Sequence, residues 1–119
     1  MPSNATRGAK WKGRSKRWME QQPRYSAVFD MEINRIVYTP NGMIPTKRDQ
    51  LGADLGALDL YKNKVVLIQV KGGGKPLKAL QADAQRAFDE YEFPKKAVRL
   101  ELHVWRPFAH DPIVVELTK

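Results

Sequence analysis

The sequence predicts a mixed α/β fold, and three observations lead to this prediction. Apolar residues recur at helical spacing in two segments, 10–22 and 77–91, as they do in amphipathic helices. β-Branched and aromatic residues gather in several shorter runs that are typical of strands. Strand-like runs lie on both sides of the second helical segment, which favours a sheet covered by helices. The length of 119 residues suits one domain.

The N-terminal part divides into a short arm and a helix. Residues 1–9 show no hydrophobic periodicity, so we expect a mobile basic arm there and a single domain over residues 10–119. A helix is predicted from Lys10 to Gln22, because its apolar residues lie at i, i+7 and i+8. Pro23 would end this helix.

The next segment is predicted to be rich in strands. Residues 25–31 and 33–38 carry aromatic and β-branched residues, which indicates two strands that could pair as a hairpin. Residues 39–42, Thr-Pro-Asn-Gly, are typical of a turn. Residues 43–50 contain a proline and three charges, and a loop is expected there.

The centre of the chain gives a sharper prediction. Asp54–Leu60 and Val65–Lys71 read as two strands joined by the short polar turn of residues 61–64. The second strand is apolar on both faces until Gln69, as expected of a buried central strand. Three glycines, residues 72–74, would end it and form a flexible exit that lets a ligand approach.

A helix and two strands are predicted after the glycines. Apolar residues recur at steps of three and four from Leu77 to Tyr91, after a proline suited to a first helical turn. Val98–Trp105 alternates apolar and polar residues, which indicates a half-buried strand, and Ile113–Leu117 supplies the last strand. The polar face of the alternating strand carries Arg99, Glu101, His103 and Trp105, of which the tryptophan is expected to pack in the core.

Positive charge is concentrated near the N-terminus. The formal net charge is +8, and the first 25 residues hold seven cations against one acid, Glu20, which is +6 of that total. This local excess favours phosphate contacts with a nucleic acid over the alternative of a solvated basic arm. The cations expected to contact DNA are Arg7, Lys10, Lys12, Arg14, Lys16 and Arg17, together with Lys47, Arg48, Lys75 and Lys78.

Composition also excludes several classes of protein. The chain has no cysteine, which excludes a disulfide framework, a thiolate zinc site and a cysteine nucleophile. No window approaches the roughly 18 apolar residues of a membrane span, and the N-terminus lacks the apolar region of a secretory signal. We therefore expect a cytoplasmic protein that does not contact the membrane.

The central hairpin places three polar residues on one face. With a two-residue turn at residues 62–63, Asp54 would lie opposite Lys71 and Gly56 opposite Gln69, and Gly56 would leave space between them. Moving that turn by one residue keeps the same faces, whereas a three-residue turn would reverse them. The carboxylate, the amide and the ammonium group would then converge at one end of the sheet.

These three groups could perform phosphodiester hydrolysis. Carboxylate and carbonyl oxygens suit Mg²⁺, which also takes phosphate oxygens of a substrate. Lys71 could orient a water molecule or neutralise charge that develops on the phosphate. A purely structural cross-strand pair of Asp54 and Lys71, with Gln69 at the strand edge, remains the alternative.

The run Gly-Ala-Asp-Leu at residues 52–55, a turn, and Val-Val-Leu-Ile-Gln-Val-Lys-Gly at 65–72 resembles the core of the PD-(D/E)xK nuclease superfamily. Within it, the chain is most similar to small archaeal-type Holliday junction resolvases and their phage relatives, from about Arg7 to Lys119. The resemblance implies a mixed central sheet flanked by helices, in a prokaryote or a phage-infected cell.

The same resemblance assigns roles to single residues. Asp54 matches the metal-binding aspartate, Gln69 the second acidic position and Lys71 the catalytic lysine. The backbone carbonyl of Val70 matches a further metal ligand. The implied cofactor is Mg²⁺, for which Mn²⁺ could substitute.

The chain departs from the family pattern at two places. Gln69 replaces the usual glutamate and offers one carbonyl oxygen without charge. Relatives also carry a glutamate on the first helix, about four residues after a basic residue that is followed by glycine. Here that position holds Lys12, counted from Arg7-Gly8, or Arg17, counted from Lys12-Gly13. Glu20 is the only carboxylate of that helix and would need a shift of about two helical turns. Other acids that could donate are Asp30, Glu32 and Asp49.

The sequence therefore predicts a magnesium-dependent endonuclease that resolves four-way DNA junctions by paired cuts. Two cuts on opposed strands need two sites, so a symmetric homodimer is expected. The alternatives are a non-catalytic DNA-binding module of the same fold, or a nuclease of this fold that acts on other branched, nicked or modified DNA.

Overall fold

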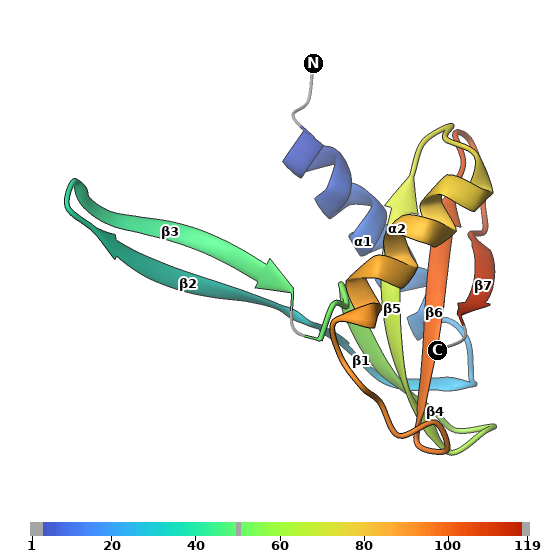
Figure 1. Ribbon diagram of the computed structural model, residues 1–119. Helices are drawn as coiled ribbons and strands as arrows, with labels where there is room; N and C mark the ends of the chain where they lie inside the picture. Colours follow the sequence, from blue (N-terminus) through green and yellow to red (C-terminus); the bar gives the residue numbers. More distant parts are fainter. Residues whose placement is uncertain (1–3, 50, 118–119) are drawn as a thin grey trace.

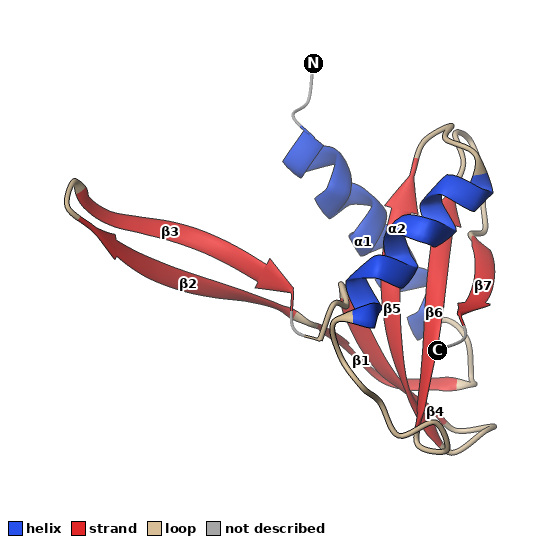
Figure 2. Ribbon diagram, viewed as in Figure 1, coloured by secondary structure: helices blue, strands red, loops and turns tan. Residues whose placement is uncertain are grey.

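A five-stranded sheet with one helix on each face forms the body of the protein (Figures 1 and 2). In this computed structural model the backbone is described for residues 4–49 and 51–117, and side chains within these ranges except 4–9, 32–37 and 44–49. The sheet order is β1-β4-β5-β6-β7, in which β5 and β6 are parallel and the other neighbours antiparallel. The predicted mixed α/β architecture is confirmed. The elements are α1 (Asn4–Glu20), β1 (Tyr25–Asp30), β2 (Glu32–Thr39), β3 (Gly42–Asp49), β4 (Leu55–Asp59), β5 (Lys64–Gly72), α2 (Leu77–Asp89), β6 (Val98–Trp105) and β7 (Ile113–Leu117).

The apolar core lies on both faces of the sheet. On one face Leu80, Ala84 and Phe88 of α2 pack with Leu67 of β5 and its neighbours. On the other face Met19 of α1 packs with a second set of residues from β4 and β5, which comprises Leu55, Ala57, Val66 and Ile68. Strand β5 thus alternates its side chains between two cores, and its predicted position as a buried central strand is confirmed.

Strand β6 differs from the prediction of a half-buried strand. Its residues are buried on both faces, because the polar face lies under α1 instead of facing water. Trp105 is 3% exposed and its indole N–H donates to Ser15 Oγ of α1 at 2.6 Å, which confirms its expected core position. Charged residues on this strand can be buried because they pair with one another.

The segment between β1 and β4 also differs from the prediction. β1 pairs with β4, whereas β2 pairs with β3 as a separate hairpin that projects away from the sheet (Figure 1). The loop predicted for residues 43–50 is therefore wrong. Pro45 pairs with Ile36. A proline is tolerated there because each strand of a two-stranded sheet has a free edge that needs no backbone donor.

Helix α1 is longer at its N-terminus than predicted. It begins at Asn4 and ends at Glu20, whereas the sequence indicated Lys10 to Gln22. Residues 4–9 contain alanines and Arg7, which favour a helix without apolar periodicity. The periodic pattern alone therefore placed the start of the helix too late.

Candidate active site at the carboxyl end of β5

The register of β4 and β5 differs from the predicted one by two residues, because Gly56 pairs with Leu67 and not with Gln69. Leu55 pairs with Ile68 and Asp59 with Lys64, so the connecting turn holds four residues, Leu60–Asn63, rather than two. Asp54 lies in a bend just before β4, outside this ladder, and its backbone bonds to Ile68, so the predicted pairing with Lys71 is not seen. Gln69 and Lys71 alternate with Val70 along β5 and therefore project from one face of that strand.

Asp54 is half-buried just before β4 and is tied to β5 by two hydrogen bonds. Its backbone N–H donates to the Ile68 carbonyl at 2.9 Å, and its Oδ2 accepts the Val70 N–H at 2.8 Å. The N–H and C=O of one strand residue point to the same neighbour, so the Val70 carbonyl also faces the side of Asp54. Within the described part of the chain, Oδ1 of Asp54 has no hydrogen-bond partner.

Gln69 is 5% exposed, and its amide nitrogen donates to the carbonyl of Gly52. Gly52 has a φ of +74°, and a Cβ there would overlap the Ala87 carbonyl of α2. The close packing of Gly52 against α2 holds the Gly52 carbonyl in place. Because the nitrogen is engaged, the free atom of the amide is its oxygen Oε1. A glutamate would instead set a carboxylate oxygen against the Gly52 carbonyl, which explains why an amide suits this position.

Lys71 follows two residues later and is half-buried, with Val104 of β6 as its parallel neighbour. The glycine run beside it has another use than the predicted flexible exit. A Cβ at Gly72 would overlap the indole of Trp11, so this glycine lets α1 lie across the end of β5. Gly56 leaves no open space either, because the Phe29 ring fills the position that a Cβ would take.

The acids proposed to complete the site do not join it equally. Glu20 lies beside the start of β1, whose Tyr25 pairs with Asp59 at the far end of β4, five residues or about 17 Å from Asp54. Asp30 forms an ion pair with Lys12 at 3.1 Å, next to the strand end. Glu32 and Asp49 are opposite each other in the backbone register at the base of the β2–β3 hairpin. Their side chains lie outside the described set.

Among the described side chains, few acids join the site. The described residues contain no group of three His, Cys, Asp or Glu side chains that could hold a metal ion. A cation would have to rely on the Asp54 carboxylate, the Val70 carbonyl and the Gln69 amide oxygen. These are hard oxygen donors of the kind that Mg²⁺ takes, and its remaining positions are commonly filled by water and phosphate oxygens.

The residues predicted to contact DNA differ in their surroundings. Lys10, Arg14 and Arg17 follow one another at helical spacing along α1, so they share one face of the helix. Arg14 lies over the Trp11 ring, with its guanidinium carbon 5.1 Å from the centroid. Lys12 is paired with Asp30. Of the remaining predicted contacts, Lys16, Lys75 and Lys78 are at least partly accessible, and the side chains of Arg7, Lys47 and Arg48 are not described.

A buried charge network under α1 was missed by the sequence prediction. The Asp59 carboxylate accepts hydrogen bonds from Arg24 at 2.9 Å and from the backbone N–H groups of Tyr61 and Lys62, and it forms an ion pair with Arg99. Burial alone would raise the pKa of Asp59, but these bonds outweigh it and hold the pKa below its ordinary value.

The network continues along β6 from Arg99. Arg99 Nε donates to Glu101 at 2.8 Å, and the other Glu101 oxygen lies 3.2 Å from His103 Nε2 and from the Tyr25 hydroxyl. Burial would raise the pKa of Glu101, but His103 and Arg99 lower it overall. His103 also contacts Ser15 of α1. The alternation of charged residues within β6 was the available sequence signal for this cluster.

Comparisons with known proteins identify no relative. No family model matches the chain, and no curated protein and no solved structure matches it. No helix within the described ranges is long and apolar enough to cross a membrane.

Proposed function

We propose that this protein is a metal-dependent, structure-selective DNA endonuclease with a PD-(D/E)xK-like fold that resolves four-way junctions. The observation that carries the proposal is the carboxyl end of β5, where the Asp54 carboxylate is bonded to the strand beside Gln69 and Lys71, which share a strand face. There the Val70 N–H holds one oxygen of Asp54, and its carbonyl faces the same side.

The donor set fits a hard divalent cation. Oδ1 of Asp54, the Val70 carbonyl and Oε1 of Gln69 would hold Mg²⁺, or Mn²⁺ in its place, with substrate oxygens in the remaining positions. When bound, the ion supplies a Lewis acid and lowers the pKa of water. Lys71 orients the phosphate group and stabilises the charge that develops on it.

Positive charge on α1 provides the means to hold DNA. Lys10, Arg14 and Arg17 on one helix face suit phosphate contacts, which fix position without reading sequence. Selectivity would then come from the shape of the junction. Paired cuts require a second site, so the active species is a homodimer.

A labelled four-way junction and a matched linear duplex, each incubated with Mg²⁺ or with chelator, test this proposal. Wild-type protein should make paired nicks in the junction only with Mg²⁺. Asp54→Ala and Lys71→Ala should bind the junction with unchanged affinity and lose cleavage by roughly 10²- to 10³-fold or more. Cleavage of the duplex at an equal rate would retain the nuclease and contradict junction selectivity.

A non-catalytic DNA-binding module is the second candidate, and one observation favours it. Gln69 is buried and bonded to Gly52, and the described residues gather no third acid at the site. In that case the same assay should give junction binding without cleavage under any divalent metal. That outcome would reject the endonuclease proposal.

A further inference from the structure

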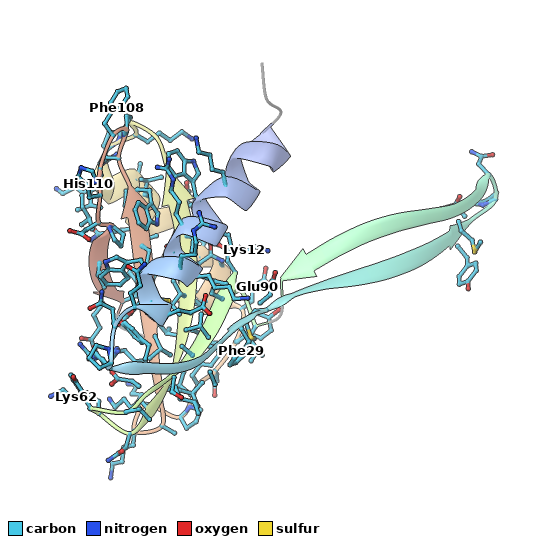
Figure 3. The ribbon with its side chains drawn as sticks, turned by 180° about the vertical axis from the view of Figure 1, so that it is seen from behind. Lys12, Phe29, Lys62, Glu90, Phe108 and His110 are labelled. Atoms are coloured by element: carbon cyan, nitrogen blue, oxygen red, sulfur yellow. The ribbon has the colours of Figure 1, made fainter. Side chains whose placement is uncertain are left out.

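One aromatic side chain is held in solvent at the end of the molecule. Phe108, in the loop between β6 and β7, is 98% exposed, the highest value among the large apolar residues that the structure describes. Figure 3 shows it pointing away from the body at the end opposite Lys62. Its φ is +62°, a left-handed conformation that is strained for a residue with a Cβ. Such strain concentrates at functional positions.

The loop that carries Phe108 is fixed at both ends. On one side the Arg106 guanidinium donates to the carbonyls of Gly73 and Lys75, at 3.0 and 2.6 Å. On the other side the Trp18 indole N–H donates to Asp111 at 3.1 Å. The exposed ring is therefore presented by a braced loop, which lowers the entropy cost of binding a ligand.

A groove of about 640 Å³ separates this loop from α1. Arg14 and Arg17 contribute its cationic wall, and Phe108 and His110 contribute the opposite wall. Two indoles also line it, but Trp105 is 3% exposed and Trp18 already packs against the rings of Tyr25 and His103. Phe108 is thus the fully exposed phenyl ring that this groove offers for stacking.

We propose that this groove binds an unpaired or unstacked nucleotide of branched DNA, with its base stacked on Phe108 and its phosphates held by Arg14 and Arg17. Cations beside an exposed aromatic ring are the combination that binds single-stranded nucleic acid, because every base offers a face for stacking. The inference rests on the proposed DNA substrate and adds the feature of the junction that is recognised. The loop follows β6, which runs parallel to β5, so the groove and the candidate active site lie toward the same end of the sheet.

Binding measurements in chelator test the groove without any cleavage. The probes are a four-way junction that carries 2-aminopurine at the branch point, whose emission reports unstacking, and a matched linear duplex. Phe108→Ala should weaken junction binding by roughly 5- to 150-fold and leave duplex binding within about twofold. Phe108→Tyr should retain wild-type affinity. Tyr61→Ala, which removes a 64%-exposed aromatic at the turn after β4, should change neither.

Three outcomes would contradict the proposal that this groove binds an unpaired nucleotide. Equal junction affinity of Phe108→Ala and wild type would remove the stacking role, and an equal loss for junction and duplex would remove the preference for unpaired bases. Conversion of a dimer to a monomer by Phe108→Ala, measured by sedimentation velocity, would identify Phe108 as a contact between two copies. The outcome of the cleavage assay is independent: Phe108-dependent junction binding without magnesium-dependent cuts would retain the groove and reject the nuclease.

Discussion

Two groups of polar side chains lie along the same central strands but differ in how far their bonding capacity is used. In the buried network, Asp59 is 1% exposed and accepts bonds from two arginines and two backbone N–H groups. At the candidate active site, Asp54 is half-buried and one of its oxygens accepts a single backbone N–H.

The difference separates charges that stabilise a fold from charges that can bind a ligand. A buried ion needs charged or hydrogen-bonding partners, because the cost of removing it from water is several kcal/mol. Its bonding capacity is then used up within the protein. Asp54 keeps an oxygen for a ligand because it lies just before β4 begins, where water can still reach it. Free bonding capacity at a partly exposed position is thus the better sign of a functional acid.

The largest expected effect comes from breaking the network. Asp59→Asn should lower the free energy of unfolding by about 3–5 kcal/mol, because Arg24 and Arg99 lose the charge that compensates them in a buried setting. Chemical denaturation monitored by circular dichroism measures this change.

Asp54→Asn is the matched control, since it makes the same chemical change at the half-buried acid of the candidate active site. It should change the free energy of unfolding by no more than about 1 kcal/mol, because the amide oxygen can still accept the Val70 N–H. Equal destabilisation by the two variants would show that both acids are structural and would contradict the comparison.

A second test uses the pH dependence of the free energy of unfolding at alkaline pH. Burial, followed by the charge of Glu101, raises the pKa of Tyr25 from 10.0 to about 12. Between these values the unfolded chain loses the phenol proton before the folded one does. The free energy of unfolding should therefore be unaffected by this group below pH 10 and fall by roughly 2–3 kcal/mol as the pH rises to 12.

Tyr25→Phe should remove that part of the slope, measured by urea denaturation from pH 8 to 12. The comparison between the two proteins isolates Tyr25 from other groups that titrate in the same range. An identical alkaline slope in both would mean that the hydroxyl is not buried beside Glu101.

A smaller loss of stability than at Asp59 is expected at Gln69. Gln69→Glu should lower the free energy of unfolding by about 1–3 kcal/mol at pH 7, because a carboxylate cannot donate to the Gly52 carbonyl. Stability should recover as the pH falls and the new carboxyl becomes a donor. Gln21→Glu, at an exposed position, serves as control, and equal effects at both positions would contradict the bond to Gly52.

The central hairpin shows how far sequence patterns reach. Side-chain period gave both strands and the common face of Gln69 and Lys71 on the second of them. It could not give the register, because the turn length depends on the Asp59 carboxylate, which binds the backbone of Tyr61 and Lys62. The Gln69 bond to Gly52 was likewise invisible, since that glycine is fixed by packing against α2.

The N-terminal half shows where patterns fail. Pro45 and the charges of residues 43–50 indicated a loop, yet β3 pairs along its whole length with β2. Which strands pair depends on long-range geometry. β1 pairs with β4, although the whole β2–β3 hairpin lies between them in the sequence.

By itself the sequence determined the mixed α/β class, the buried central strand, the second helix and the concentration of cations near the N-terminus. These follow from hydrophobic period and composition, which act locally along the chain. Only the tertiary structure decided which charges are buried and paired, where Glu20 lies, and that Phe108 lines one groove with cations of α1. These depend on which elements pack together, because burial and pairing arise between residues far apart in the sequence.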